Sequence, residues 1–73
     1  MGRLRVLSGH EVCAILSPQG FVEVRRRGSH IIMQKRSENS TITVPVPDHD
    51  ELRVGTLMSI IRQSELPRPI FET

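Results

Sequence analysis

Residues 21–36 of this 73-residue chain, which read FVEVRRRGSHIIMQKR, decide its fold. Two β-prone runs, 21–27 and 30–36, lie on either side of Gly28-Ser29. A two-residue link with glycine first is typical of the type II′ turn that joins antiparallel strands. The stretch therefore predicts a β-hairpin with its turn at Gly28 and Ser29.

The turn also predicts which residues of the two strands lie opposite each other. It pairs Arg27 with His30 and Arg25 with Ile32, and directly opposed residues share a face of the sheet. The same register places Glu23 opposite Gln34 on that face. On the other face it pairs Val24 with Met33, and Val22 with the stem of Lys35. Because the second face is the more apolar, we expect it against the core. Arg25, Arg27 and His30 are then expected on the open face.

A third strand is expected over residues 41–46, after a polar turn over 37–40. Pro45 and Pro47 cannot donate hydrogen bonds to a neighbouring strand, so this strand should lie at an edge of the sheet.

Two helices enclose this meander in the sequence. Ser8 and Glu11 have the spacing of a capping box and predict a helix over about 9–17. Apolar residues recur at helical spacing over about 54–63 and predict a second helix. The order αβββα predicts an α+β fold like that of double-stranded-RNA-binding domains, a three-stranded antiparallel sheet with both helices on one face.

The length of the chain allows one domain over 1–73, with a core over about 7–64 and an irregular tail over 65–73. Cys13 is the single cysteine, so no internal disulfide forms, and we expect a buried, unreactive thiol. No apolar run approaches the roughly 18 residues of a membrane span, and no export signal follows the first residues. These features favour the cytoplasm.

The net charge of +2 conceals an asymmetry between the two halves of the chain. Residues 1–36 hold seven lysines and arginines against two acidic residues, a net charge of +5; residues 37–73 hold three against six, a net charge of −3. A basic half on a small domain is typical of proteins that bind the phosphate backbone of nucleic acids.

His30 and the neighbouring arginines suit RNA cleavage. A neutral imidazole can take the proton of a 2′-hydroxyl so that this oxygen attacks the adjacent phosphate. Any of Arg25, Arg26 and Arg27 could hold that phosphate and offset its growing charge. A lone strand histidine is, however, more often a plain surface residue, and a run of arginines is more often a solvated one.

The other two histidines fit surface positions better than a site. His10 lies in the first turn of the first expected helix and should be exposed and neutral. His49, between Asp48 and Asp50, could be a second acid–base group or a metal ligand, but a loop histidine is the simpler interpretation. One cysteine and three scattered histidines make no zinc set, so no metal or cofactor is expected.

The chain resembles the HicA family of bacterial toxin–antitoxin systems over residues 7–64. The matching residues, in order, are Gly20-Phe21, Arg25, Gly28-Ser29-His30, Thr43-Val44-Pro45-Val46-Pro47, His49, Glu51-Leu52, Gly55-Thr56-Leu57 and Ile60-Ile61-Arg62-Gln63. The chain departs from the family after the second helix, where Ser64-Glu65 stands in place of a frequent Gly-Leu cap.

The resemblance implies a type II toxin that is an mRNA interferase, a metal-independent endoribonuclease with His30 as its catalytic histidine. It also implies a HicB antitoxin that covers the active site, and contact with DNA only through that antitoxin. The expected RNA-binding residues are Arg25, Arg26, Arg27, Gly28, Ser29 and Lys35. The alternatives are a non-catalytic RNA-binding module and, less favoured, a regulatory subunit that acts on DNA with its antitoxin.

Overall fold

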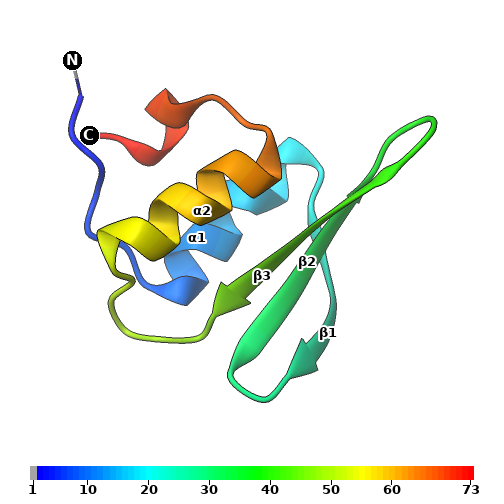
Figure 1. Cartoon of the computed structure of the whole chain (residues 1–73), viewed down its shortest axis with the longest axis horizontal. Helices are drawn as coiled ribbons and strands as arrows, with labels where there is room; N and C mark the ends of the chain where they lie inside the picture. Colours follow the sequence, from blue (N-terminus) through cyan, green and yellow to red (C-terminus); the bar gives the residue numbers. More distant parts are fainter. Residues whose placement is uncertain (1) are drawn as a thin grey trace.

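The computed structural model describes residues 2–73, so Met1 of the predicted domain lies outside the described residues. It contains one antiparallel sheet, in the order β1-β2-β3, and two α-helices on one face of it, which confirms the predicted α+β fold (Figure 1). The elements are α1 (Gly9–Leu16), η1 (Ser17–Gln19), β1 (Val22–Arg27), β2 (His30–Arg36), β3 (Thr41–Pro47), α2 (Val54–Ser64) and η2 (Arg68–Phe71), where η denotes a 3-10 helix. Among the described residues, no helix has the length and apolar character needed to cross a membrane.

α1 begins at the predicted capping box. Ser8 Oγ accepts a hydrogen bond from the Glu11 N–H at 3.1 Å, and Glu11 Oε1 accepts one from the Ser8 N–H at 2.8 Å. The hydrogen bond from the Ser8 N–H has the largest effect on the pKa of the Glu11 carboxyl and holds it below its usual value. The Ser8 hydroxyl lowers this pKa further. Gly9 approaches the Pro47 carbonyl so closely that a Cβ would collide with it, and its N–H donates to His49 O at 2.9 Å. The start of α1 is therefore fixed against the end of β3.

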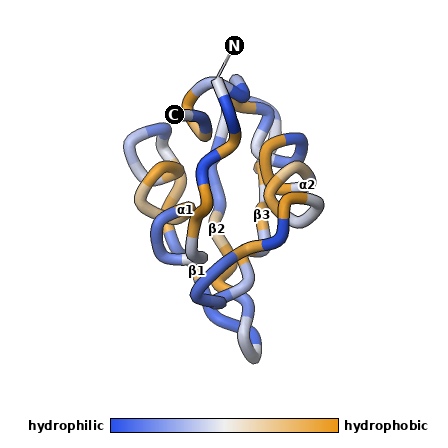
Figure 2. Tube along the Cα trace, turned by 90° about the vertical axis from the view of Figure 1, so that its left-hand side faces the viewer, coloured by the Kyte–Doolittle hydropathy of each residue, from blue (hydrophilic) through white to orange (hydrophobic). Residues whose placement is uncertain are grey.

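The core lies between the two helices and one face of the sheet. Alternate residues of β2 and β3, namely Ile31, Met33, Val44 and Val46, are at most 2% exposed and supply the floor of this core. In Figure 2 the two helices lie on either side of the N-terminal segment, with the strands behind them. The other buried apolar residues of this cluster are Leu7, Val12, Leu16, Phe21, Leu52, Leu57, Ile60 and Phe71.

β1 pairs with β2 in the predicted register only beside the turn. Arg27 lies opposite His30 and Arg25 opposite Ile32, as expected. Beyond Arg25 the register shifts, and Glu23 lies opposite Met33. The predicted pairs of Glu23 with Gln34, Val24 with Met33 and Val22 with Lys35 are therefore wrong, and Val22 pairs with Gln34.

A β-bulge at Val24 causes this shift. The bulge inserts one unpaired residue, and since side chains alternate along a strand, every residue beyond it changes face. Val22 and Val24 are consequently 60% and 43% exposed instead of packing under the helices. Glu23 turns towards α1, where its charge adds to the effect of burial in raising the pKa of the Cys13 thiol. Cys13, half-buried, is thereby kept in its protonated, poorly nucleophilic form.

The tail also differs from expectation, because it is folded onto the core instead of being irregular. η2 places Phe71 at 0% exposure, and the segments near both ends of the chain pair in a bridge between Leu4 and Glu72. Arg5 N–H donates to Phe71 O at 3.0 Å. An aromatic side chain buries a large apolar area, which offsets the cost of ordering this short segment. Before it, Glu65 ends α2 with φ +59°, the left-handed conformation that glycine adopts more readily.

Phe71→Ala should therefore lower the free energy of unfolding by about 3–5 kcal/mol, because it leaves a cavity in the core. Urea denaturation followed by circular dichroism measures the loss. Val6→Ala is the matched control: Val6 is 74% exposed, and its truncation should change the free energy by less than about 0.5 kcal/mol. Equal, small losses in both variants would show that the tail contributes nothing to the core.

Candidate active site

The turn between β1 and β2 has the backbone geometry that the sequence predicts. Gly28 has φ +57° and Ser29 a negative φ, which is the combination of a type II′ turn. A Cβ on Gly28 would meet nothing within 4 Å, so its backbone conformation and not a lack of space favours glycine there. Ser29 O accepts a hydrogen bond from the Asp48 N–H at 2.6 Å. The turn is thus held from the side of β3 as well as by its own hairpin.

His30 is the first residue of β2 and lies between the two outer strands. It pairs with Arg27 of β1 and with Pro47 of β3, and it is exposed. Within residues 2–73 its side chain makes no hydrogen bond to another residue. The imidazole is therefore open to solvent or to a substrate on a face that the helices do not cover.

Arg25 and Arg27 share this open face with His30. Both are exposed, and neither has a carboxylate within 4.0 Å among the described residues. Because no ion pair within the chain occupies them, both guanidinium groups are available to an anion. The open face thus combines one imidazole and two cations beside a fixed turn.

Arg26 belongs to a different cluster. It lies opposite Ile31, on the helix side of the sheet, and its Nη1 donates to Asp48 Oδ2 at 2.6 Å. The other carboxylate oxygen of Asp48 lies 3.1 Å from Nε2 of His10, which is 73% exposed as expected. The hydrogen bond from Arg26 holds the pKa of the Asp48 carboxyl below its usual value. Of the three arginines, only Arg25 and Arg27 therefore lie on the same face of the sheet as His30.

Lys35, the remaining candidate contact to RNA, is also separate from His30. It lies opposite Ile42, on the helix side and near the far end of β2, and the carbons of its stem approach Gly20. Its stem therefore fills space beside the end of η1, as a long lysine side chain often does.

Asp48 is the residue that sequence reasoning missed. Its carboxylate joins β1 to α1 through Arg26 and His10, and its N–H binds Ser29 O. The only signal in the sequence was its place directly after Pro47, within a stretch that reads as polar loop. His49, which follows it, is exposed and lines a separate hollow that includes Glu51 and Arg53.

The metal-ligating side chains do not cluster in the part of the chain that the structure describes. No group of three histidine, cysteine, aspartate or glutamate side chains comes together in residues 2–73. The chemistry available on the open face is that of an imidazole and guanidinium groups.

Comparison with protein families identifies a match over most of the chain. The family described as the HicA toxin of bacterial toxin–antitoxin systems matches residues 9–66, most of the 73-residue chain. Searches of curated proteins and of solved structures gave no match. The matched residues include the turn, His30 and both helices.

Asp48→Asn should lower stability in a pH-dependent way. Because the pKa of Asp48 is depressed in the folded state, the stabilisation is present above the unfolded pKa and is lost as the pH falls through the folded pKa. We expect a lower melting temperature than for the unmodified protein near pH 7, and a difference that narrows as the pH is lowered from about 5 to about 2. Melting curves at several pH values measure it. A difference that stays constant over this range would contradict a role for the charge of Asp48.

Proposed function

The chain belongs to the HicA family of toxins of bacterial toxin–antitoxin systems, and from this premise we propose that it is an endoribonuclease that cleaves mRNA with His30 as its single catalytic residue. The observation that carries the proposal is the geometry around His30. Its exposed side chain, which makes no hydrogen bond within the described residues, lies opposite Arg27 and on the same face as Arg25, next to a turn that Asp48 holds by a hydrogen bond. An imidazole can act as the general base, and guanidinium groups can stabilise the charge that develops on the phosphate.

In the proposed reaction the neutral His30 side chain accepts the proton of a ribose 2′-hydroxyl. The 2′-oxygen attacks the adjacent phosphorus, and the bond from phosphorus to the 5′-oxygen breaks. The products are a 2′,3′-cyclic phosphate and a 5′-hydroxyl, whose proton comes from solvent. DNA lacks the 2′-hydroxyl and is therefore not a substrate.

Arg25 and Arg27 bind the scissile phosphate and its neighbours in this proposal. Charge-assisted hydrogen bonds from guanidinium groups stabilise the negative charge that develops on the phosphate oxygens. Gly28 and Ser29 position His30 through the turn that Asp48 holds. Arg26 acts indirectly, because its ion pair with Asp48 supports that turn; Lys35 remains a peripheral contact.

A toxin of this kind needs an inhibitor in its own cell, and we assign that role to a HicB-type antitoxin in a type II system. Acidic side chains of the antitoxin would pair with Arg25 and Arg27 and cover His30. Such complementarity speeds association and fixes orientation. The toxin would act in the cytoplasm, where its mRNA substrate lies, and would reach DNA only through the antitoxin.

The second candidate function is binding of RNA without cleavage. The same exposed cations favour it, since Arg25 and Arg27 could grip phosphates while His30 is only one more contact. The two functions differ in turnover and not in affinity, so activity with and without the imidazole separates them.

His30→Ala should abolish RNA cleavage and growth inhibition while RNA binding and the melting temperature stay close to those of the unmodified protein. The side chain is exposed, so its removal leaves no cavity. The assay follows cleavage of labelled mRNA in EDTA, with His49→Ala, another exposed histidine, as the matched control that keeps activity. Full cleavage by His30→Ala would refute the mechanism, and binding without turnover by the unmodified protein would favour the second candidate.

Charge reversal on the open face should weaken RNA binding more than charge reversal elsewhere. Arg25→Glu with Arg27→Glu removes two phosphate contacts, which should also reduce the slope of log affinity against log salt by about 1.4. Arg53→Glu with Arg62→Glu changes the net charge equally but at exposed positions beside and within α2. Binding to the His30→Ala protein is measured by fluorescence anisotropy at several salt concentrations. Equal losses from both pairs would mean that RNA binds through overall charge and not through this face.

A further inference from the structure

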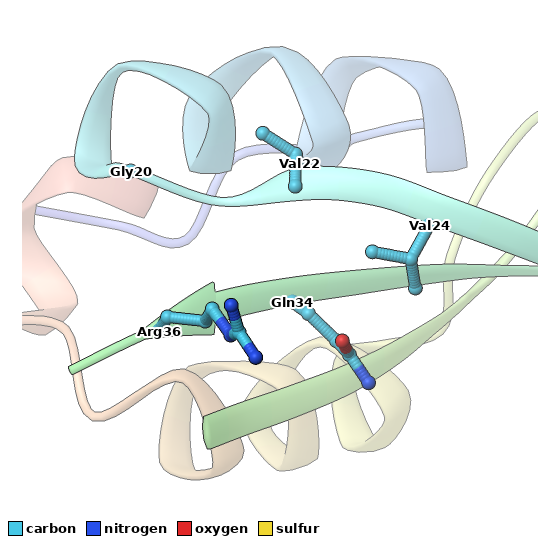
Figure 3. Close-up of a pocket in the computed structure, with 5 residues that line it drawn as sticks. All are labelled: Gly20, Val22, Val24, Gln34 and Arg36. Atoms are coloured by element: carbon cyan, nitrogen blue, oxygen red, sulfur yellow. The ribbon is translucent and has the colours of Figure 1, made fainter. Parts of the chain in front are cut away.

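A hollow on the open face lies beyond the candidate active site, towards the other end of β2. It has a volume of about 500 Å³ and is lined by Gly20, Val22, Val24, Gln34 and Arg36 (Figure 3). Gln34 is four residues from His30, and a strand rises about 3.3 Å per residue, so the two side chains are roughly 13 Å apart along β2. The hollow is thus a neighbour of His30 on the same face and not part of its immediate surroundings.

The bulge at Val24 builds the floor of this hollow. Without the extra residue, Glu23 would lie on the open face opposite Gln34, and the two valines would face the helices. With it, Val22 and Val24 are exposed on the open side, and Glu23 is turned towards α1. Glu23 is the only acidic residue in the three strands, so no strand residue on the open face carries negative charge. The bulge therefore produces an apolar surface without repulsion towards a polyanion.

Gln34 supplies a polar group in a fixed orientation above this floor. Its Nε2 donates to Oγ1 of Thr43, on the neighbouring strand, at 3.2 Å. The bond uses one of the two N–H groups, and among residues 2–73 the second N–H and the carbonyl oxygen have no partner. A primary amide held in this way presents one donor next to one acceptor. The edge of a nucleobase presents a complementary pair.

Arg36 closes the hollow at the end of β2. It is exposed and, in the described part of the chain, has no carboxylate within 4.0 Å. Arg25 and Arg27 lie at the opposite end of the same face. Cations thus stand at both ends of the face that holds the hollow, a charge arrangement that suits the successive phosphates of one RNA strand lying along β2.

From this arrangement we infer that the hollow is a nucleobase subsite for single-stranded RNA. One base lies against Val22 and Val24, the Gln34 amide binds its edge, and Arg36 binds a phosphate beyond it. Phe21 and Phe71, the only aromatic residues, are buried, so aliphatic side chains take the place of the usual stacking platform. The inference rests on the proposed function and adds to it a residue, Gln34, that selects the base a short distance from the cleaved bond.

The first test is a titration of the His30→Ala protein with a short single-stranded RNA of mixed sequence, followed by nuclear magnetic resonance. We expect the methyl signals of Val22 and Val24 and the side-chain amide signal of Gln34 to shift together with those of Arg25 and Arg27. Shifts confined to Arg25 and Arg27 would overturn the subsite and leave the proposed function standing. No binding at all would overturn both, and valine shifts only with an acidic antitoxin would make the hollow a protein-docking surface instead.

The second test compares matched substitutions by their RNA affinity in the His30→Ala protein and by the base preference of RNA cleavage. Val24→Glu introduces a carboxylate into the hollow and should weaken RNA binding at least about tenfold. Val54→Glu introduces the same group at an exposed valine in the first turn of α2 and should leave affinity unchanged. Gln34→Leu, in a protein with His30 intact, should flatten the base preference at one position near the cleaved bond by about fivefold or more. Unchanged affinity with Val24→Glu, or unchanged preference with Gln34→Leu, would overturn the inference.

Discussion

The side chains of β1 are distributed between the two faces of the sheet by two backbone features, the turn at Gly28-Ser29 and the bulge at Val24. The turn determines the register of the residues beside it and so places Arg25 with His30. The bulge moves the side chains of the residues before it to the opposite face of the sheet. If the bulge were absent, Glu23 would lie on the open face, and Val22 and Val24 would face the helices. The charge and the apolar area of this face therefore depend on a single inserted residue.

Much of the fold follows from local signals that the sequence states directly. The turn is marked by a glycine in the position that needs a positive φ, and α1 by the reciprocal bonds of Ser8 and Glu11. The placement of His30 opposite Arg27 follows from the turn alone, because these two residues directly flank Gly28 and Ser29. The part of the candidate site next to the turn could therefore be predicted without knowledge of the rest of the fold.

The features that sequence reasoning missed are those that no local signal marks. Val22-Glu23-Val24 alternates equally well in either register, and no glycine indicates the bulge. Asp48 lies 22 positions from Arg26, so only the completed fold brings the two together. Phe71 follows two prolines in a short segment, and its burial depends on α1, α2 and the N-terminal segment being in place. In each case the missing information is non-local packing.

The bridge between Leu4 and Glu72 joins residues 68 positions apart, which has a consequence for the order of folding. Closing so long a loop is entropically unfavourable until intervening segments have condensed, whereas the hairpin closes over two residues. The β-meander can therefore form early, and the end segments dock onto it late. The same order in reverse means that the ends detach first during partial unfolding. A species with η2 undocked but the hairpin intact would keep His30 and its arginines in place, so that local opening at the ends need not interrupt the chemistry on the far side of the sheet.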